Sequence, residues 1–315
     1  MYLKSKLLYL YTETPLHAGA GAGLGAIDLP IQRERVTHYP IVQASGIKGA
    51  IRSHAVPVGA DDNLKREGDV VFGPENPATG DDHAGAFAPG DARILLFPVR
   101  SLTGVFAWTT SLDVLRRWQR EATAVAGPNL PALPDKEPDD GRCFVPDTRG
   151  VVAQDTVVLE EFAYTVDNSP MQMVKDLAKW LANHALPQGD EYSWWRDGLQ
   201  KKLVILPDDD FRDFARYATE VLTRIRLEQE TKTVKDGALW TEEHLPVDTL
   251  LFVPVRATRF RAGEDEWRKV NGWQKLDGAE AQAAAVLQWV EDRVNGRIQI
   301  GGDETVGRGV VALRW

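Results

Sequence analysis

Cysteine is almost absent from this 315-residue chain, which contains only Cys143. A single thiol excludes an internal disulfide and suits a reducing cytoplasm, where we expect the protein to reside. The chain also lacks any apolar run near the ~20 residues that a membrane span requires, so no membrane association is expected. The apolar segment at 7–11 is too short for a secretory signal and is predicted to be a first strand.

An excess of positive charge is likewise missing. The chain has 46 acidic and 37 basic residues and a net charge of −9, which argues against nonspecific binding to nucleic acid. The distribution is uneven, however. Positions 33–54 hold four basic residues and one acid, which leaves room for a local basic groove: Arg33, Arg35, Lys48 and Arg52 against Glu34.

Apolar residues make up 43% of the chain, enough to bury a full core. Their spacing, with no fixed-period repeat, favours an α+β fold: a twisted antiparallel sheet with helices on one face, of the ferredoxin-like kind. Strands are predicted at 6–14, 93–100, 104–109, 151–166 (as a strand or hairpin), 202–206, 250–256, 298–300 and 310–315, and helices at 45–54, 111–121, from 169, from 208 and at 277–295.

Capping residues and segments rich in glycine and proline set the predicted boundaries of the helices and strands. Ser45 is a plausible N-cap for a helix whose apolar stripe is Ile47 and Ile51. Asp277 and Glu280 have capping-box spacing. Between the regular elements we expect an irregular Gly-, Pro- and Asp-rich insertion at 57–92, a proline-rich linker at 127–141 and an amphipathic excursion at 225–249.

The glycine-rich stretch at 19–26 follows the first predicted strand. Residues 21–26 (GAGLGA) satisfy the G-x-G-x-x-A dinucleotide fingerprint, which requires a helix to begin inside the loop. Pro30 forbids that early helix, and no acid lies at the ribose-binding distance. Two interpretations remain: a flexible loop, or a loop whose backbone approaches another polymer closely.

Asp28 follows these glycines without a paired carboxylate nearby, so a two-carboxylate acid–base scheme has no local support. By itself, a lone Asp is more often a turn residue or cap than a catalytic group. His17 lies eleven residues upstream and by itself fits a strand-end histidine better than a catalytic one. If the loop folds back, His17 and Asp28 could face one phosphodiester.

Lys48 and Arg52 lie four residues apart, on one stripe of the predicted helix. Such cations often form only a solvated face. The neighbouring basic residues make contacts to successive phosphates an equal alternative.

Several strings together resemble the RAMP superfamily, and within it the repeated backbone subunit of type III-B CRISPR (Cmr) effector complexes. The first is the N-terminal set HAG at 17–19, DLPIQRE at 28–34, YP at 39–40 and SGIKGAIR at 45–52. The others are LWTEEHLP at 239–246 and the closing loop IGGDETVGRG at 300–309. They span the chain.

The resemblance implies a single domain over 1–315, with a modified RRM-like palm, helical fingers and a protruding thumb hairpin. Its parts would be the first strand, catalytic loop and first helix at 1–56, a helical insertion at 165–200, the thumb at 225–249 and palm completion at 250–315. It also implies copies stacked as a helical filament on a crRNA guide, with other Cmr subunits as partners. Each thumb would displace one base pair of the guide–target duplex at every sixth position. The target RNA would be cut beside these gaps with a divalent metal, Mg²⁺ or Mn²⁺.

By motif position, the resemblance makes Asp28 the catalytic and metal-binding aspartate. His17 would assist proton transfer or only shape the loop, and Glu242 and Glu243 would contribute a second carboxylate from the adjacent subunit. The expected RNA contacts are Gln32, Arg33, Ser45, Lys48, Arg52, Lys232, Trp240 and Arg308. Trp240, with Leu239, would wedge against unstacked bases, although a packed tryptophan on a surface hairpin is an equal alternative. One departure is His244, which stands where a tyrosine is expected. A non-catalytic scaffold that only measures guide length is the alternative function.

Overall fold

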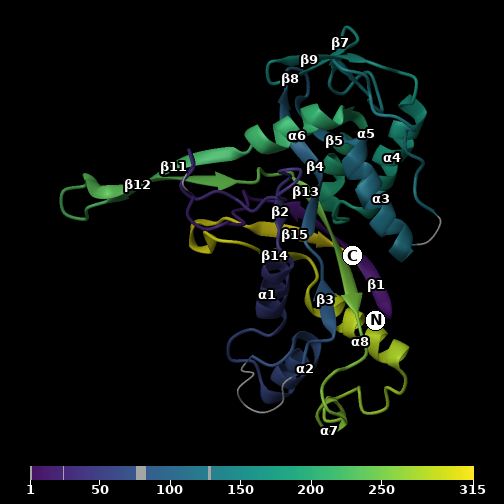
Figure 1. Ribbon diagram of the computed structural model, residues 1–315, viewed down its shortest axis with the longest axis vertical. Helices are drawn as coiled ribbons and strands as arrows, with labels where there is room; N and C mark the ends of the chain where they lie inside the picture. Colours follow the sequence, from purple (N-terminus) through teal and green to yellow (C-terminus); the bar gives the residue numbers. More distant parts are fainter. Residues whose placement is uncertain (1, 24, 76–82, 127–128) are drawn as a thin grey trace.

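A large, mostly antiparallel sheet runs through the molecule, and strand β1 (Lys4–Thr12) is one of its inner strands (Figure 1). The computed structural model describes residues 2–23, 25–75, 83–126 and 129–315. The main strand order is β14 (Arg297–Gln299), β15 (Val310–Arg314), β1, β13 (Leu250–Ala257), β4 (Ala92–Ser101), β8 (Thr156–Leu159), β9 (Phe162–Val166) and β6 (Arg142–Cys143). The predicted mixed fold with a mostly antiparallel sheet is therefore confirmed, and the predicted 151–166 segment contains a hairpin.

Helices cover both faces of β1. Successive side chains of a strand point to opposite faces, so β1 contacts a different helix on each. The Tyr9 hydroxyl accepts a hydrogen bond from Trp118 of α3 (Leu112–Ala126) at 3.0 Å. Lys4, on the other face, pairs with Glu280 of α8 (Ala279–Arg293) at 3.2 Å. The prediction that helices lie on one face only is wrong.

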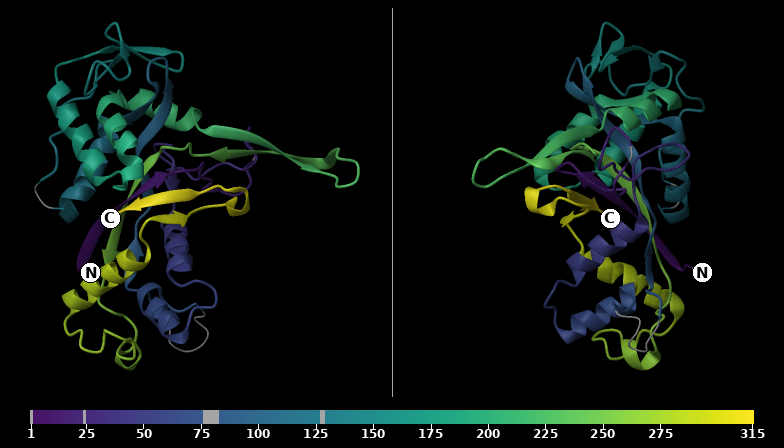
Figure 2. Two further views of the ribbon diagram at one scale, coloured as in Figure 1. Left: turned by 180° about the vertical axis from the view of Figure 1, so that it is seen from behind. Right: turned by 60° about the vertical axis from the view of Figure 1, so that its left-hand side comes forward.

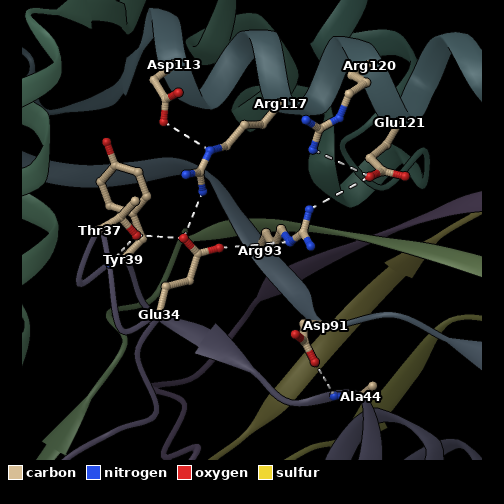
Figure 3. Close-up of polar contacts among 10 residues, drawn as sticks. All are labelled: Glu34, Thr37, Tyr39, Ala44, Asp91, Arg93, Asp113, Arg117, Arg120 and Glu121. Carbon is tan, nitrogen blue, oxygen red and sulfur yellow. Dashed lines mark hydrogen bonds and ion pairs between the residues drawn. The ribbon is translucent and has the colours of Figure 1, made fainter.

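Helix α1 (Ala44–Ala55) buries Ile47 and Ile51 as predicted, but Ser45 is not its N-cap. The N-cap position is Gln43, whose side chain makes no capping bond. Instead, the first amide of the helix, at Ala44, donates to the Asp91 carboxylate at 2.8 Å (Figure 3). A residue 47 positions away supplies the partner that a helix start requires.

The predicted capping box before α8 is also wrong. Gly278 occupies the N-cap position with φ of 93°, a left-handed conformation that favours glycine, and no side chain caps the helix. The helix core is as predicted, with Val286, Leu287 and Val290 buried.

The segment predicted as an irregular insertion at 57–92 contains helix α2 (Asp62–Phe72). The Asp61 carboxylate accepts from the amide of Leu64 at 2.8 Å and caps the helix. Val70 and Val71 reach the core. Part of the segment, 76–82, lies outside the described residues, as do 127–128 of the predicted linker.

The remaining elements follow the predicted pattern in part. Strands β5 (Val105–Ser111) and β10 (Leu203–Leu206) pair in parallel, so the sheet is not wholly antiparallel. The apolar stripe predicted after position 169 is buried in α4 (Met171–His184). The other elements are β2 (Ile41–Val42), β3 (Phe87–Pro89), β7 (Val152–Ala153), α5 (Ser193–Lys202), α6 (Asp208–Tyr217), α7 (Glu264–Trp267) and two short 3₁₀ turns, Asp190–Tyr192 and Glu304–Val306.

A separate two-stranded hairpin, β11 (Glu220–Leu227) and β12 (Val234–His244), projects well beyond the rest of the molecule (Figures 1 and 2). It begins at Glu220, five residues before the predicted excursion, because the strand that enters it already pairs there with His244. Among the described residues, no helix is long and apolar enough to cross a membrane.

Candidate functional site

The base of strand β12 holds two distant parts of the N-terminal region. Leu245 and Leu16 exchange backbone hydrogen bonds of 2.9 Å. The Leu29 amide donates to the Thr241 carbonyl, and the Glu243 amide donates to the Leu29 carbonyl, both at 3.0 Å. The glycine-rich loop is therefore closed onto the hairpin base, as the folded-back interpretation requires.

Asp28 is exposed and held by one residue of that base. Its Oδ2 accepts from the backbone amide of Thr241 at 2.8 Å and from the Thr241 hydroxyl at 2.9 Å. These bonds, the backbone bond first, lower the pKa of the Asp28 carboxyl below its ordinary value. The site thus presents a carboxylate that is ionised at neutral pH and fixed in orientation. Thr241 was not predicted, although it lies inside the LWTEEHLP string.

His17 lies at the same base, on the neighbouring residues. Its Nδ1 is 2.7 Å from the carbonyl oxygen of Glu243. Because a carbonyl only accepts, Nδ1 carries a proton, and Nε2 makes no hydrogen bond among the described residues. The structure therefore brings His17 and Asp28 to one five-residue stretch, Thr241–Leu245.

Glu242 is buried inside its own chain, with 4% of its surface exposed. Its Oε1 accepts from the indole of Trp240 at 2.6 Å. Its Oε2 has no hydrogen-bond partner among the described residues and lies 4.0 Å from His244 Nε2. Within its own chain, strand β12 turns this carboxylate inward, toward Trp240 and His244.

Glu243 is the residue of this region that sequence reasoning undervalued. It is 3% exposed and accepts from the amide of Ile31 at 3.0 Å, from Arg33 at 2.5 Å and from the hydroxyl of Thr219 at 2.7 Å. Since strand side chains alternate, Glu242 and Glu243 point to opposite faces. Glu243 clamps the loop, while Glu242 faces His244.

Known proteins resemble this chain over its full length. The profile of the RAMP superfamily matches residues 9–312. This chain belongs to the RAMP superfamily. It is 35% identical over 314 residues to the CRISPR system Cmr endoribonuclease Cmr4 of Pyrococcus furiosus, covering 99% of this chain and 95% of the relative. It is 26% identical to the CRISPR system CMR subunit Cmr4 of Saccharolobus solfataricus, covering 100% and 97%. The crystal structure of oligomeric Cmr4 from Pyrococcus furiosus superimposes with a TM-score of 0.71 at 30% identity, covering 99% and 97% of the two chains.

Two of the residues predicted to contact RNA, Arg33 and Gln32, make hydrogen bonds within this RAMP protein. Besides Glu243, Arg33 donates to backbone carbonyls of His38, Ala215 and Arg216 at 2.8–3.1 Å. Gln32 donates to the Gly19 carbonyl at 3.0 Å and accepts from the Gln43 amide at 2.8 Å. Both side chains support the loop, and the sequence could not show their partners.

Lys48 and Arg52 serve different surroundings, although they share a helix. Lys48 lines a pocket of about 270 Å³ with Ser45 and Arg261. Burial lowers the pKa of Lys48, and the positive charges of Arg52 and Arg261 lower it further. Arg52 points to α2, where it donates to the Gly73 carbonyl at 2.7 Å and to Asp69 at 3.2 Å. Of the two cations on the predicted stripe, Lys48 therefore lines the pocket and Arg52 joins two helices.

The predicted RNA-contacting residues of the hairpin differ in their exposure. Lys232 is exposed at the tip. Leu239 is 64% exposed, whereas Trp240 is half-buried on the other face and bonded to Glu242. Of the predicted wedge, Leu239 is the exposed side chain, and Trp240 is partly buried with its indole bonded to Glu242. Arg308, in the closing loop, is partly buried, and its Nε has no partner among the described residues.

A network of arginines and carboxylates fixes the loop on its other side (Figure 3). Glu34 accepts from Arg117 of α3 at 2.8 Å and from the Thr37 hydroxyl at 2.6 Å, while Arg93 lies 3.9 Å away. These contacts bind the turn after Arg33 to helix α3. Together with Glu243, they hold the stretch that follows Asp28, residues 31–34.

Proposed function

We propose that this RAMP protein is the guide-RNA-binding backbone subunit of a type III-B CRISPR ribonucleoprotein, and that it cleaves target RNA complementary to the guide. The observation that carries the proposal is the exposed, ionised Asp28 fixed on the hairpin base. Full-length similarity to a protein named CRISPR system Cmr endoribonuclease supports the reaction class. Similarity to an oligomeric Cmr4 structure supports self-assembly into a filament on the crRNA, beside other Cmr subunits.

The projecting hairpin suits the opening of a duplex. Five of its apolar side chains are about half exposed or more: Val221, Ile225, Leu227, Val234 and Leu239. Apolar side chains of this kind can support unstacked bases, and a duplex read by its backbone shape needs no sequence-specific contact. Lys232, at the tip, is placed to meet a phosphate. The hairpin would thus act as the thumb, displacing a base pair next to the Asp28 loop.

Cleavage then follows from positioning. RNA carries its own nucleophile, the 2′-hydroxyl, and a displaced nucleotide can align it in line with the adjacent phosphodiester. Asp28 is fixed by Thr241 and needs no rearrangement to act on that phosphodiester. His17 offers its Nε2 at the same base, where it either takes up a proton or holds the loop.

The residues present fit a divalent metal that is bound mainly by RNA. One Asp28 oxygen is used by Thr241, and the other has no partner among the described residues. Mg²⁺ typically keeps several waters and is held by one or two carboxylates plus substrate phosphates, and Mn²⁺ accepts the same ligands. Asp28 would hold the metal, which when bound stabilises charge that develops on the cleaved phosphate.

Guide binding is assigned to the pocket beside α1. Ser45 and Lys48 line it with Arg261, so two cations and a hydroxyl converge there. Phosphate oxygens favour such partners.

The test is reconstitution of the complex with a guide RNA and an end-labelled complementary target. We expect a ladder of products with six-nucleotide spacing that is abolished by chelation of divalent metal. A wild-type complex that binds target without cutting it would favour the non-catalytic scaffold instead.

A further inference from the structure

A cluster of metal-ligating side chains lies beside the Asp28 loop but does not include Asp28. The ligand atoms of His17, His244 and Asp303 all lie within 4.8 Å of one another. His244 Nε2 is 3.5 Å from the Asp303 carboxylate and 4.0 Å from Glu242 Oε2. Two imidazoles and one carboxylate thus converge from three distant parts of the chain, and the Glu242 carboxylate lies beside His244.

The central histidine is an exception to the rule that buried polar groups are hydrogen-bonded. His244 is fully buried, and neither of its ring nitrogens has a hydrogen-bond partner among the described residues. Glu242 Oε2 is likewise buried and unpartnered in the described part of the chain. Such orphaned groups, aimed at one another, are accounted for by a ligand between them.

His17 is set up as a metal ligand in the usual way. Metal-binding histidines commonly donate their second ring N–H to a carbonyl or carboxylate, which fixes the tautomer. Here Nδ1 of His17 donates to the Glu243 carbonyl at 2.7 Å, so Nε2 is free to coordinate. The absence of a side chain at Gly19 keeps that atom open, since a Cβ there would lie 2.8 Å from Nε2.

The closing loop is built onto His17. The Gly302 amide donates to the His17 carbonyl at 2.9 Å, and a Cβ at Gly301 would lie 2.3 Å from that oxygen. Both glycines therefore permit the close approach that brings the partly exposed Asp303 to His244. This gives a physical role to the glycines of the GGDETVGRG string.

We propose that His17, His244 and Asp303 bind one divalent transition metal of the zinc class, with Glu242 Oε2 completing a four-ligand site. Ligand atoms of a tetrahedral zinc site lie about 2.0–2.2 Å from the metal and so roughly 3.4 Å apart. The His244–Asp303 pair already has this spacing, and His17 must approach by about an ångström. Imidazole ligands favour zinc-class metals over Mg²⁺, so this site is distinct from the one proposed at Asp28.

The metal would act as a staple. It would join the N-terminal loop, the hairpin base and the closing loop, and it would assign His17 to holding the loop. Arg224, 3.8 Å from Glu242, and the nearby Arg308 oppose a cation here, and the two carboxylates offset them. The inference is independent of RNA cleavage.

The test is zinc binding by the full-length chain after removal of metals with a chelator. ZnCl₂ is titrated in competition with a chromophoric chelator, and bound zinc is counted by mass spectrometry. We expect one zinc per chain, at least ~tenfold weaker binding in Asp303→Asn and in His244→Phe, and a higher melting temperature with zinc in wild type only. The phenylalanine replaces an orphaned polar ring by an apolar one, so loss of zinc there is not a folding defect.

Two controls make the result decisive. His184→Ala removes an exposed histidine of α4, and Asp28→Asn changes the proposed cleavage site; both should bind zinc like wild type. Binding of Co²⁺ should give visible bands of oxygen and nitrogen ligation without thiolate bands, because Cys143 is buried elsewhere. The proposal is overturned if wild type binds no zinc, if the cluster variants bind as tightly as wild type, or if Asp28→Asn loses the metal.

Discussion

Replacement of Glu243 by alanine is the sharpest test of how the loop is held. The side chain is almost fully buried and accepts three hydrogen bonds, from Ile31, Arg33 and Thr219. Its removal leaves Arg33, only 17% exposed, without its carboxylate. Breaking a buried ion pair by removing one partner typically costs about 3–5 kcal/mol. We therefore expect the free energy of unfolding to fall by about that amount.

The measurement is urea unfolding of the isolated chain, followed by circular dichroism, with hydrogen exchange at the Ile31 amide as a local readout. Glu243→Gln keeps the shape and should cost less, roughly 1.5–3 kcal/mol for one charged hydrogen bond. Glu230→Ala removes the same charge from the exposed hairpin tip and should change stability by less than about 0.5 kcal/mol. If Glu243→Ala unfolds within about 0.5 kcal/mol of wild type and exchange at Ile31 is unchanged, the clamp does not hold the loop.

Three further predictions concern single side chains. Thr241→Val removes a hydroxyl bond that lowers the pKa of Asp28, so the Asp28 pKa should rise. When the solution is acidified, single-turnover cleavage by this variant should therefore be lost at a higher pH than in wild type. An unchanged acid side of the pH–rate profile would contradict the role of Thr241. Lys48→Gln should weaken guide binding and reduce the slope of log affinity against log salt concentration by about 1. Arg52→Gln should leave this slope unchanged, because Arg52 is paired within the protein. Equal slopes for Lys48→Gln and wild type would show that Lys48 does not contact the guide. Burial raises the pKa of the Cys143 thiol to about 12. A thiol reagent at pH 8 should therefore modify one group per chain in urea and none in the native protein. Rapid labelling of the native protein would show that the β6 region is open to solvent.

Periodic burial was readable from the sequence, and partners distant along the chain were not. Ile47 and Ile51 mark one face of α1, and the core positions of α4 and α8 follow the same rule. The start of α1, in contrast, is satisfied by Asp91 rather than Ser45. Helix α2 was missed because glycine, proline and aspartate flank a short amphipathic segment whose cap, Asp61, resembles a turn residue.

The site shows the same division. The motif strings identified Asp28 and the hairpin, since both lie inside contiguous stretches of sequence. The role of Glu243 depends on contacts across more than 200 positions, and the cluster of His17, His244 and Asp303 joins three such segments. Spacing along the chain carries no information about such contacts. Arg33 and Arg52 were predicted as RNA contacts without knowledge of the partners that the fold gives both side chains.

The central claim is that Asp28 performs the cleavage while the rest of the protein positions the RNA. The most direct measurement is the single-turnover rate constant of target cleavage by a reconstituted complex containing Asp28→Asn, at target concentrations that saturate binding. The amide keeps the size of the side chain and an oxygen that can accept from Thr241, but it removes the negative charge. We predict unchanged target affinity and a rate constant reduced by at least about a hundredfold. Cleavage at the wild-type rate, with the same six-nucleotide ladder, would contradict the account.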